Sequence, residues 1–235
     1  MGEETPEITI KAPEKKEREA KGRGVVVHFV RHGEAASYRP GGGLTEEGRE
    51  QAFEAGKSLL SKIGKDEMVK FVYSPLERAR ESNEVMTEGL KEAIEEEKRN
   101  DVKLYSPRPE AKLRPQDLID ETRFIQLKRE GKDVIGYWLS GFITAEEAET
   151  PELVLERVKE FIKRREKISQ RLPEGPAIHY VCITHSPFMR TLLRDAFGED
   201  FGEPKMGESI ELLFASDQEP QVKFRDRATE YKPRE

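Results

Sequence analysis

The stretch Val25–Glu34, VVVHFVRHGE, decides the fold of this chain. Its first six residues are apolar and mostly β-branched apart from His28, which is the length and composition of a buried parallel strand. The run ends abruptly in Arg31 and His32, and the chain then turns polar. Because open α/β sheets build their sites at the carboxyl ends of strands, this end of the run is predicted to deliver both side chains to a site.

Two later predicted strands show the same pattern, an apolar run followed directly by polar residues. The apolar run Val69–Tyr73 leads directly into Ser74, with Arg78 in the helix that follows. The run Ala177–Thr184 leads into His185, again with a helical pattern beyond it. Because the carboxyl ends of parallel strands lie on the same edge of a sheet, we expect these side chains to converge with those of the first strand.

The order of the predicted elements indicates an α/β fold. Strand–helix units, an insertion and then a helix–strand–helix unit imply a mainly parallel sheet with helices on both faces. Thr45, Ser74 and Ser186 are the predicted N-caps of three helices. The predicted strands cover residues 25–30, 69–73, 102–105, 177–184, 210–214 and 221–224, and the predicted helices cover 46–63, 75–100, 117–130, 133–139, 150–171 and 187–197.

The chain is predicted to form a single domain over residues 24–235. Residues 1–23 are rich in Glu, Lys, Pro and Ala with few apolar anchors, which predicts a mobile charged tail. Prolines interrupt the pattern in residues 106–150, and this segment is predicted to be a lid inserted over the site rather than part of the sheet. The last ten residues are polar and are expected to fray.

Composition limits the partners. The net charge of −6 argues against nucleic-acid binding, which needs a basic face. No apolar stretch approaches the length of a membrane span and the N-terminus has no apolar signal region, so we expect a cytoplasmic protein without a membrane partner. Cys182 is the only cysteine, which excludes an internal disulfide framework and a cysteine-rich zinc site. The oligomeric state is not indicated by the sequence.

A binding site for a phosphoryl group is predicted at this edge of the sheet. It combines two arginines and two histidines at or just beyond strand ends with the N-termini of two helices. Arg31 and Arg78 can each offer paired donors to phosphate oxygens, and helix N-termini favour anions. The placement of His32 and His185 at strand ends favours a functional interpretation of both over a structural one.

Other polar features have simpler interpretations. His28 and His179 lie inside strands and are interpreted as core histidines. Four residues along a strand place His28 roughly 13 Å from His32, too far for shared metal coordination. Gly41–Gly43 is not followed by Lys-Ser or Lys-Thr, so it is interpreted as a flexible loop facing the substrate and not as a nucleotide-binding loop.

The sequence resembles the histidine phosphatase superfamily, which has the phosphoglycerate mutase-like fold. Four motifs carry the resemblance in family order, each at the expected strand or helix end. They are Arg31–Glu34 (RHGE), Leu44–Ala52 (LTxxGxxQA), Ser74–Ser82 (SPxxRAxxS) and Thr184–His185 before a helix. The resemblance implies a three-layer sandwich.

The resemblance also implies a mechanism. His32 would attack phosphorus and form a phosphohistidine, while Arg31, Arg78 and His185 hold the phosphate oxygens. A carboxyl group would protonate the leaving oxygen and then activate water. No metal or other cofactor is implied, and the partner is a small phosphorylated substrate or a phosphoprotein.

The sequence departs from the family pattern at the acid. Relatives with a clear acid carry Leu-x-Glu shortly after the third strand, and here Pro115 takes the place of that glutamate. We favour Asp117 because it begins the predicted helix after the proline. The other candidates are Glu110, Asp120 and Glu121. Some relatives lack this acid and act on good leaving groups such as phosphohistidine in proteins.

The leading prediction is therefore a metal-independent phosphatase that acts on a phosphomonoester. A phosphoglycerate-type mutase is a second hypothesis, although Ala35 and Ala36 stand where such mutases carry polar residues that grip the substrate. A third is a catalytically weak module that binds a phosphorylated ligand or a partner, which the missing acid would explain.

Overall fold

The computed structural model of the chain describes residues 24–37, 41–215 and 218–232. The predicted tail over residues 1–23 lies outside the described residues.

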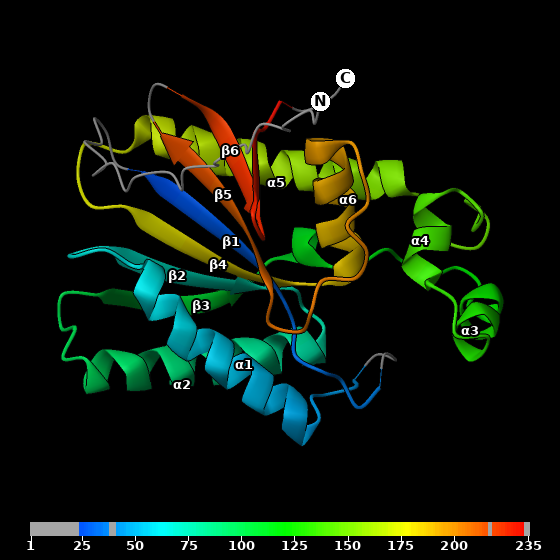
Figure 1. The fold of residues 1–235 in the computed structure, drawn as a ribbon, viewed down its shortest axis with the longest axis horizontal. Helices are drawn as coiled ribbons and strands as arrows, with labels where there is room; N and C mark the ends of the chain where they lie inside the picture. Colours follow the sequence, from blue (N-terminus) through cyan, green and yellow to red (C-terminus); the bar gives the residue numbers. More distant parts are fainter. Residues whose placement is uncertain (1–23, 38–40, 216–217, 233–235) are drawn as a thin grey trace, which may run out of the picture.

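A seven-stranded sheet forms the centre of the molecule, in the order β3-β2-β4-β1-β5-β6-β7 (Figure 1). The first four strands in chain order pair in parallel and the last three pair antiparallel. Their bounds are β1 Val25–Arg31, β2 Met68–Tyr73, β3 Lys103–Pro109, β4 Ile178–Thr184, β5 Ser209–Ala215, β6 Gln218–Phe224 and β7 Arg227–Glu230. The predicted α/β fold with a mainly parallel core is confirmed.

Helices cover both faces of this sheet, as predicted. On one face lie α1 (Glu46–Leu59), continued by a short 3₁₀ turn, and α2 (Glu77–Glu96) (Figure 1). On the other face lie α5 (Pro151–Arg171) and α6 (Ser186–Phe197). The core is therefore divided by the sheet into two layers.

Strand β1 belongs to both layers. It lies between β4 and β5, and all seven of its residues are buried. Phe29 packs against Phe161 of α5 and Phe188 of α6. Val30 belongs to the opposite layer, with Leu59 of α1. Burial on both faces explains why the strand is apolar almost without interruption.

The register aligns the carboxyl ends of the three central parallel strands. Arg31 of β1 lies opposite Thr184 of β4, and Tyr73 of β2 lies opposite Ile183. The residues that follow each strand therefore lie at one edge of the sheet, as predicted from the sequence.

The segment between β3 and α5 carries three short helices. They are a 3₁₀ turn at Ala111–Leu113, α3 at Thr122–Arg129 and α4 at Val134–Leu139. Helices α3 and α4 lie together at one end of the molecule (Figure 1). The role of this segment as a lid stays a prediction.

Several expected boundaries were wrong. The helix predicted over 117–130 begins at Thr122, so Asp117 does not begin it. Strand β3 continues to Pro109 instead of ending at Tyr105, because it is an edge strand of the sheet and tolerates proline there. Helix α2 begins at Glu77 and ends at Glu96, inside the predicted limits of 75 and 100. Of the last ten residues, which were expected to fray, Arg227–Glu230 form β7 and pair with β6, and the Tyr231 hydroxyl donates to Asp195 Oδ2 at 2.9 Å. Residues 233–235 lie outside the described residues.

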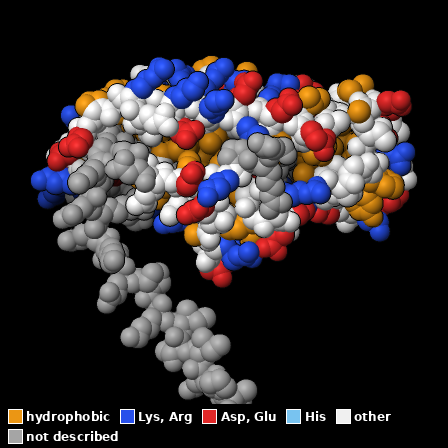
Figure 2. Space-filling model, turned by 90° about the horizontal axis from the view of Figure 1, so that it is seen from above, with side chains coloured by type: hydrophobic (Ala, Val, Ile, Leu, Met, Phe, Trp, Pro, Cys, Tyr) orange, Lys and Arg blue, Asp and Glu red, His pale blue; other side chains and the backbone are white. Residues whose placement is uncertain are grey.

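Lys/Arg and Asp/Glu side chains both occur across the face of the molecule shown in Figure 2. Among the helices of the described ranges, none combines the length and the apolar character needed to cross a membrane. The expected cytoplasmic location stays a prediction.

Candidate active site

His32 stands immediately beyond β1 and is 2% exposed. Its Nδ1 lies 2.7 Å from the carbonyl oxygen of Gly33, and its Nε2 lies 3.2 Å from Nε of Arg78. The carbonyl can only accept and the guanidinium can only donate, so Nδ1 carries the proton and the electron pair of Nε2 accepts the hydrogen bond from Arg78. This is the tautomer that a nucleophilic histidine requires, and Gly33 supplies the acceptor that fixes it.

Electrostatics keep this imidazole neutral. Burial lowers the pKa of His32 to about 3, and the positive charges of Arg78 and Arg31 act in the same direction, against the hydrogen bond to Gly33. A histidine with this pKa carries no charge at neutral pH, so Nε2 is unprotonated and keeps its electron pair.

His185 faces His32 from the end of β4. The two ring centroids are 4.9 Å apart, and the rings meet edge to face. Burial lowers the pKa of His185 well below its usual value, and the charges of nearby Arg78 and Arg31 lower it further. Its Nε2 lies 2.8 Å from the Ser74 hydroxyl, and Nδ1 is buried without a partner in the described part of the chain.

The expected roles of Ser74 and Ser186 as helix caps were wrong. Helix α2 begins after Leu76 with no side-chain cap, and the Ser74 hydroxyl bonds to His185 instead. The residue before α6 is His185, and the Ser186 hydroxyl donates to Glu203 at 2.6 Å. Both serine hydroxyls therefore bond to side chains around the site and not to helix N-termini. Thr45 caps α1 as predicted, because its hydroxyl accepts from Gly48 N at 2.9 Å.

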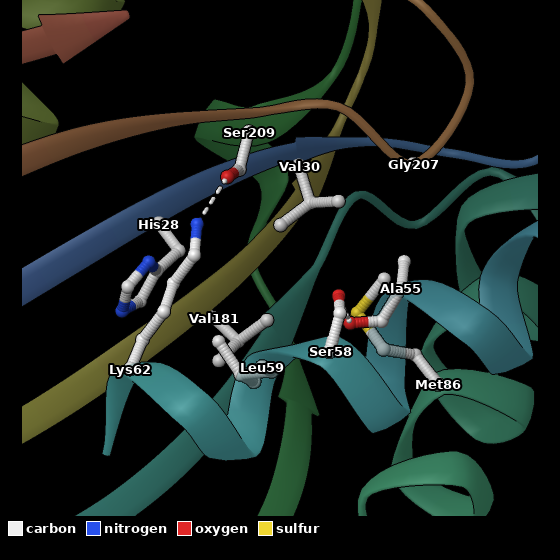
Figure 3. A pocket seen from close by; sticks show the side chains of 10 residues that line it. All are labelled: His28, Val30, Ala55, Ser58, Leu59, Lys62, Met86, Val181, Gly207 and Ser209. Carbon is white, nitrogen blue, oxygen red and sulfur yellow. Dashed lines mark hydrogen bonds between the residues drawn. The ribbon is translucent and has the colours of Figure 1, made fainter. Parts of the chain in front are cut away.

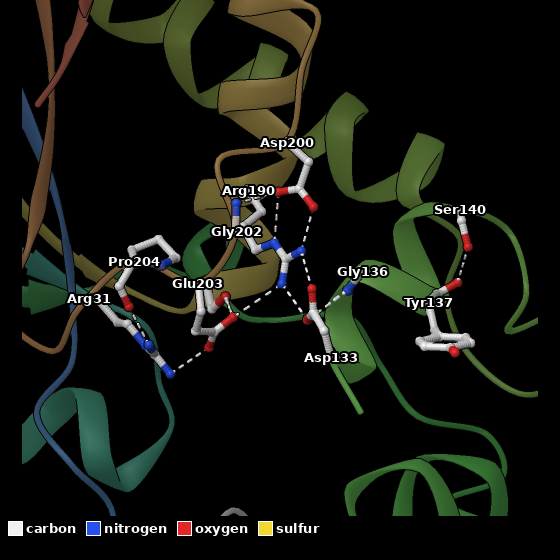
Figure 4. A network of polar contacts seen from close by, with 11 residues as sticks. Arg31, Asp133, Gly136, Tyr137, Ser140, Arg190, Asp200, Gly202, Glu203 and Pro204 are labelled. Carbon is white, nitrogen blue, oxygen red and sulfur yellow. Dashed lines mark hydrogen bonds and ion pairs between the residues drawn. The ribbon is translucent and has the colours of Figure 1, made fainter. Parts of the chain in front are cut away.

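Arg31 is the last residue of β1, and both Nη atoms of its guanidinium have partners. Its Nη1 donates to the carbonyl of Pro204, and its Nη2 lies 2.6 Å from Oε1 of Glu203 (Figure 4). Its Nε is buried and has no partner among the described residues. Arg31 acts electrostatically on both His32 and His185, so its charge belongs to the same site.

Backbone contacts explain the spacing of the motifs. Ser82 Oγ accepts from Gly33 N at 3.0 Å and donates to the carbonyl of Arg78 at 2.7 Å, which links the end of β1 to the first turns of α2. Gly33 must be glycine, because a Cβ there would lie 2.1 Å from the carbonyl oxygen of Gly48 in α1. The Thr45 hydroxyl also donates to Glu34 Oε2 at 2.9 Å.

The structure separates the four candidate acids. Glu110 follows β3 at the same sheet edge, where its amide donates to the Tyr73 carbonyl at 2.8 Å, one residue before Ser74. The Asp117 carboxylate pairs with Arg114 at 2.7 Å and is 64% exposed. The other two lie at the start of α3, where Asp120 accepts from Thr122 N and Glu121 is exposed.

The histidines inside the strands lie outside this site, as expected. His28 Nε2 lies 2.9 Å from His179 Nδ1, and His179 Nε2 lies 2.8 Å from Glu67 Oε2. His28 borders a cavity of about 30 Å³, where Lys62 donates to Ser209 (Figure 3). This volume has room for about two water molecules and is too small for a metabolite.

The described residues contain no group of three or more His, Cys, Asp or Glu side chains arranged to hold a metal ion. Arg31 and Arg78 supply positive charge at the site.

A sequence model of the histidine phosphatase superfamily (branch 1) matches residues 27–101. The predicted resemblance to this superfamily is confirmed. The matched residues run from β1 to the end of α2 and contain His32 and Arg78, while His185 lies beyond them. A search of curated proteins found no match.

Solved structures of this fold cover most of the chain. A mycobacterial hydrolase is 16% identical with a TM-score of 0.62, and covers 88% of this chain and 100% of its own. Phosphoglycerate mutase from Bacillus anthracis is 16% identical with a TM-score of 0.58, covering 88% and 94%. Mycobacterial glucosyl-3-phosphoglycerate phosphatase is 16% identical with a TM-score of 0.55, covering 81% and 91%. At these identities the comparison establishes the fold, which phosphatases and mutases share.

Three features of the site were not predicted from the sequence. They are the contact of Ser74 with His185, the Gly33 carbonyl that fixes His32, and Glu203 on Arg31. The serine stands inside a recognised motif and could have been identified there. Glu203 is one of 47 acidic residues and lies in no motif, so the sequence gives no signal for it.

Proposed function

We propose that this chain is a metal-independent phosphatase that hydrolyses a phosphomonoester through a phosphohistidine on His32. The observation that carries the proposal is the pairing of a neutral Nε2 on His32 with cationic and donor groups around it. Two buried nitrogens near it, Arg31 Nε and His185 Nδ1, have no partner in the described residues. A phosphoryl group bound there would satisfy them, since an unpaired buried donor is costly.

In the proposed first step, Nε2 of His32 attacks phosphorus as the bond to the leaving oxygen breaks. Positive charge develops on the imidazole, and the Gly33 carbonyl stabilises it through Nδ1–H. Arg78 transfers its hydrogen bond from Nε2 to the phosphoryl oxygens, and Arg31 and His185 donate to the same oxygens. The leaving oxygen takes a proton from a carboxyl group.

In the second step water attacks the phosphohistidine. The carboxylate left by the first step takes a proton from this water, the N–P bond breaks, and inorganic phosphate leaves. His32 returns to its neutral form. No step requires charge beyond that of the two arginines.

The backbone position of Glu110 supports it as this acid in place of our sequence-based choice, Asp117. Glu110 is joined to the strand that leads to Ser74, whereas Asp117 pairs with Arg114 at the surface. Glu110→Gln should slow hydrolysis of an alkyl phosphate far more than that of an activated aryl phosphate, because only a poor leaving group needs protonation. The same selective loss in Asp117→Asn, with none in Glu110→Gln, would reverse the assignment.

The proposal is tested by turnover of an activated aryl phosphate in the presence of a chelator. We expect wild-type hydrolysis and none with His32→Ala. No turnover by either protein would favour the alternative of a module that only binds a phosphorylated ligand. Transfer of a phosphoryl group between positions of phosphoglycerate, faster than its hydrolysis, would favour the mutase.

A further inference from the structure

Glu203 joins the proposed phosphate site to a buried arginine outside it. It lies between α6 and β5, and its two carboxylate oxygens contact different partners (Figure 4). Oε1 lies 2.6 Å from Nη2 of Arg31. Oε2 accepts from the Ser186 hydroxyl at 2.6 Å and lies 3.3 Å from Nη1 of Arg190.

Arg190 of α6 holds this arrangement in place. Its side chain is fully buried, and it pairs with two further carboxylates. Its Nη1 and Nη2 donate to Asp133 at 2.6 and 2.7 Å, and its Nε donates to Asp200 at 2.9 Å. A buried guanidinium with three carboxylates around it has a fixed orientation, because any other arrangement leaves charge unpaired. Oε2 of Glu203 is therefore anchored, and Oε1 remains for Arg31.

Arg31 needs such an anchor. Arginine has five donors and several rotatable bonds. The conformational entropy that its side chain loses on becoming ordered opposes the binding of a small anion. The Glu203 carboxylate and the Pro204 carbonyl occupy the two Nη atoms from one side. The buried Nε has no partner in the described chain, so this donor remains for a ligand.

We propose that Glu203 is a positioning residue for Arg31, and that Arg190 and Ser186 hold it in place for this role. Glu203 is 45% exposed at its side chain, so it is not needed to fill the core. The inference rests on the proposed function of the site, because it assigns to Arg31 the binding of phosphate.

The test is a double-mutant cycle on the binding of vanadate, a phosphate analogue, measured by calorimetry. Glu203→Gln keeps the shape of the side chain and removes its charge. We expect about tenfold weaker vanadate binding in the wild-type background, the size of one charged hydrogen bond, and no change in the Arg31→Ala background. In hydrolysis, KM should rise with kcat changed less, since the ground state already uses Arg31.

A matched control is Glu199→Gln. Glu199 lies in the same segment between α6 and β5, and it pairs with Arg227 at 2.7 Å on the surface. It should leave vanadate binding unchanged. Glu203→Asp keeps the charge but withdraws it by one methylene, and it should weaken binding less than Glu203→Gln. Thermal unfolding of every variant shows whether it folds.

Two results would overturn the inference. Tighter vanadate binding by Glu203→Gln would show that Glu203 competes with the anion for Arg31. An equal loss in both backgrounds would show an effect that does not pass through Arg31. Absence of vanadate binding in the wild type is a different outcome, since it would reject the proposed function itself.

Discussion

At the scale of single residues, the sequence identifies the groups that can do chemistry but not the groups that orient them. His32, Arg31, Arg78 and His185 follow from motifs at strand ends, and the structure brings them together. Their partners come from backbone carbonyls and distant loops, which carry no signature. The Gly33 carbonyl is an example, since any residue has one.

Ser74→Ala tests a side-chain contact that lies within a motif and orients His185. A Ser74 hydroxyl that donates to Nε2 of His185 leaves the proton on Nδ1, ready for a phosphate oxygen. Its loss should lower kcat/KM for an aryl phosphate about tenfold and lower the free energy of unfolding by about 1–3 kcal/mol, because it leaves the buried Nε2 without a partner. The matched control is Ser61→Ala, whose exposed hydroxyl donates to the Ser58 carbonyl. A loss of stability without a loss of kcat/KM would contradict this role.

At the scale of elements, periodicity predicts which segments are helices but not what each face contacts. In the sequence Gly56 shares a helical face with the apolar residues Ala52 and Leu59, a spacing that predicts close approach of this helix to the sheet. It packs on α2 instead: a Cβ at Gly56 would lie 2.1 Å from the Met86 carbonyl oxygen, and one at Gly89 would lie 2.2 Å from that of Phe53. Helical spacing alone does not distinguish a neighbouring helix from a sheet.

Gly56→Ala should therefore destabilise the protein. In an unpacked helix alanine would be more stable than glycine by about 1 kcal/mol. Here the added methyl group meets backbone atoms, and separating α1 from α2 should lower the free energy of unfolding by roughly 2 kcal/mol. Urea denaturation measures this, with Glu54→Ala on the exposed side of the same helix as the control. Stabilisation by Gly56→Ala would show that the helices are not in close contact.

At the scale of the whole molecule, the parallel core was predictable because buried strands and amphipathic helices alternate along the chain. The antiparallel extension was predictable only in part. β5 and β6 were expected, but β7 has four polar or small residues and gains its stability from pairing with β6. Segments with short helices, such as α3 and α4, depend on tertiary contacts more than on their own pattern.

Buried neutral histidines give the molecule a specific pH dependence. The pKa values of His28, His32 and His185 are lowered in the folded state by burial and by neighbouring positive groups. Below pH 6.5 the unfolded chain binds protons that these histidines do not, so stability falls as the pH falls. His32 alone, with a pKa of about 3, should contribute up to about 1.4 kcal/mol per pH unit.

Denaturation by urea at pH 7.5 and pH 5.5 measures this dependence. We expect a clear loss of stability at pH 5.5 and a smaller loss in His32→Asn, which lacks the titrating group. The lowered pKa values of Glu67 and Asp101 act only below their ordinary ranges and so do not enter this window. Equal stability at the two pH values would contradict the burial of these histidines in neutral form.

The central claim is that His32 accepts the phosphoryl group, and trapping the phosphoenzyme tests it most directly. The protein is mixed with excess activated aryl phosphate, quenched in alkali within one turnover to preserve phosphohistidine, digested and analysed by peptide mass spectrometry. We predict one phosphoryl group on the peptide that contains His32, formed at least as fast as phosphate is released, and none in His32→Ala. Turnover without this adduct, or an adduct on another residue, would contradict the account.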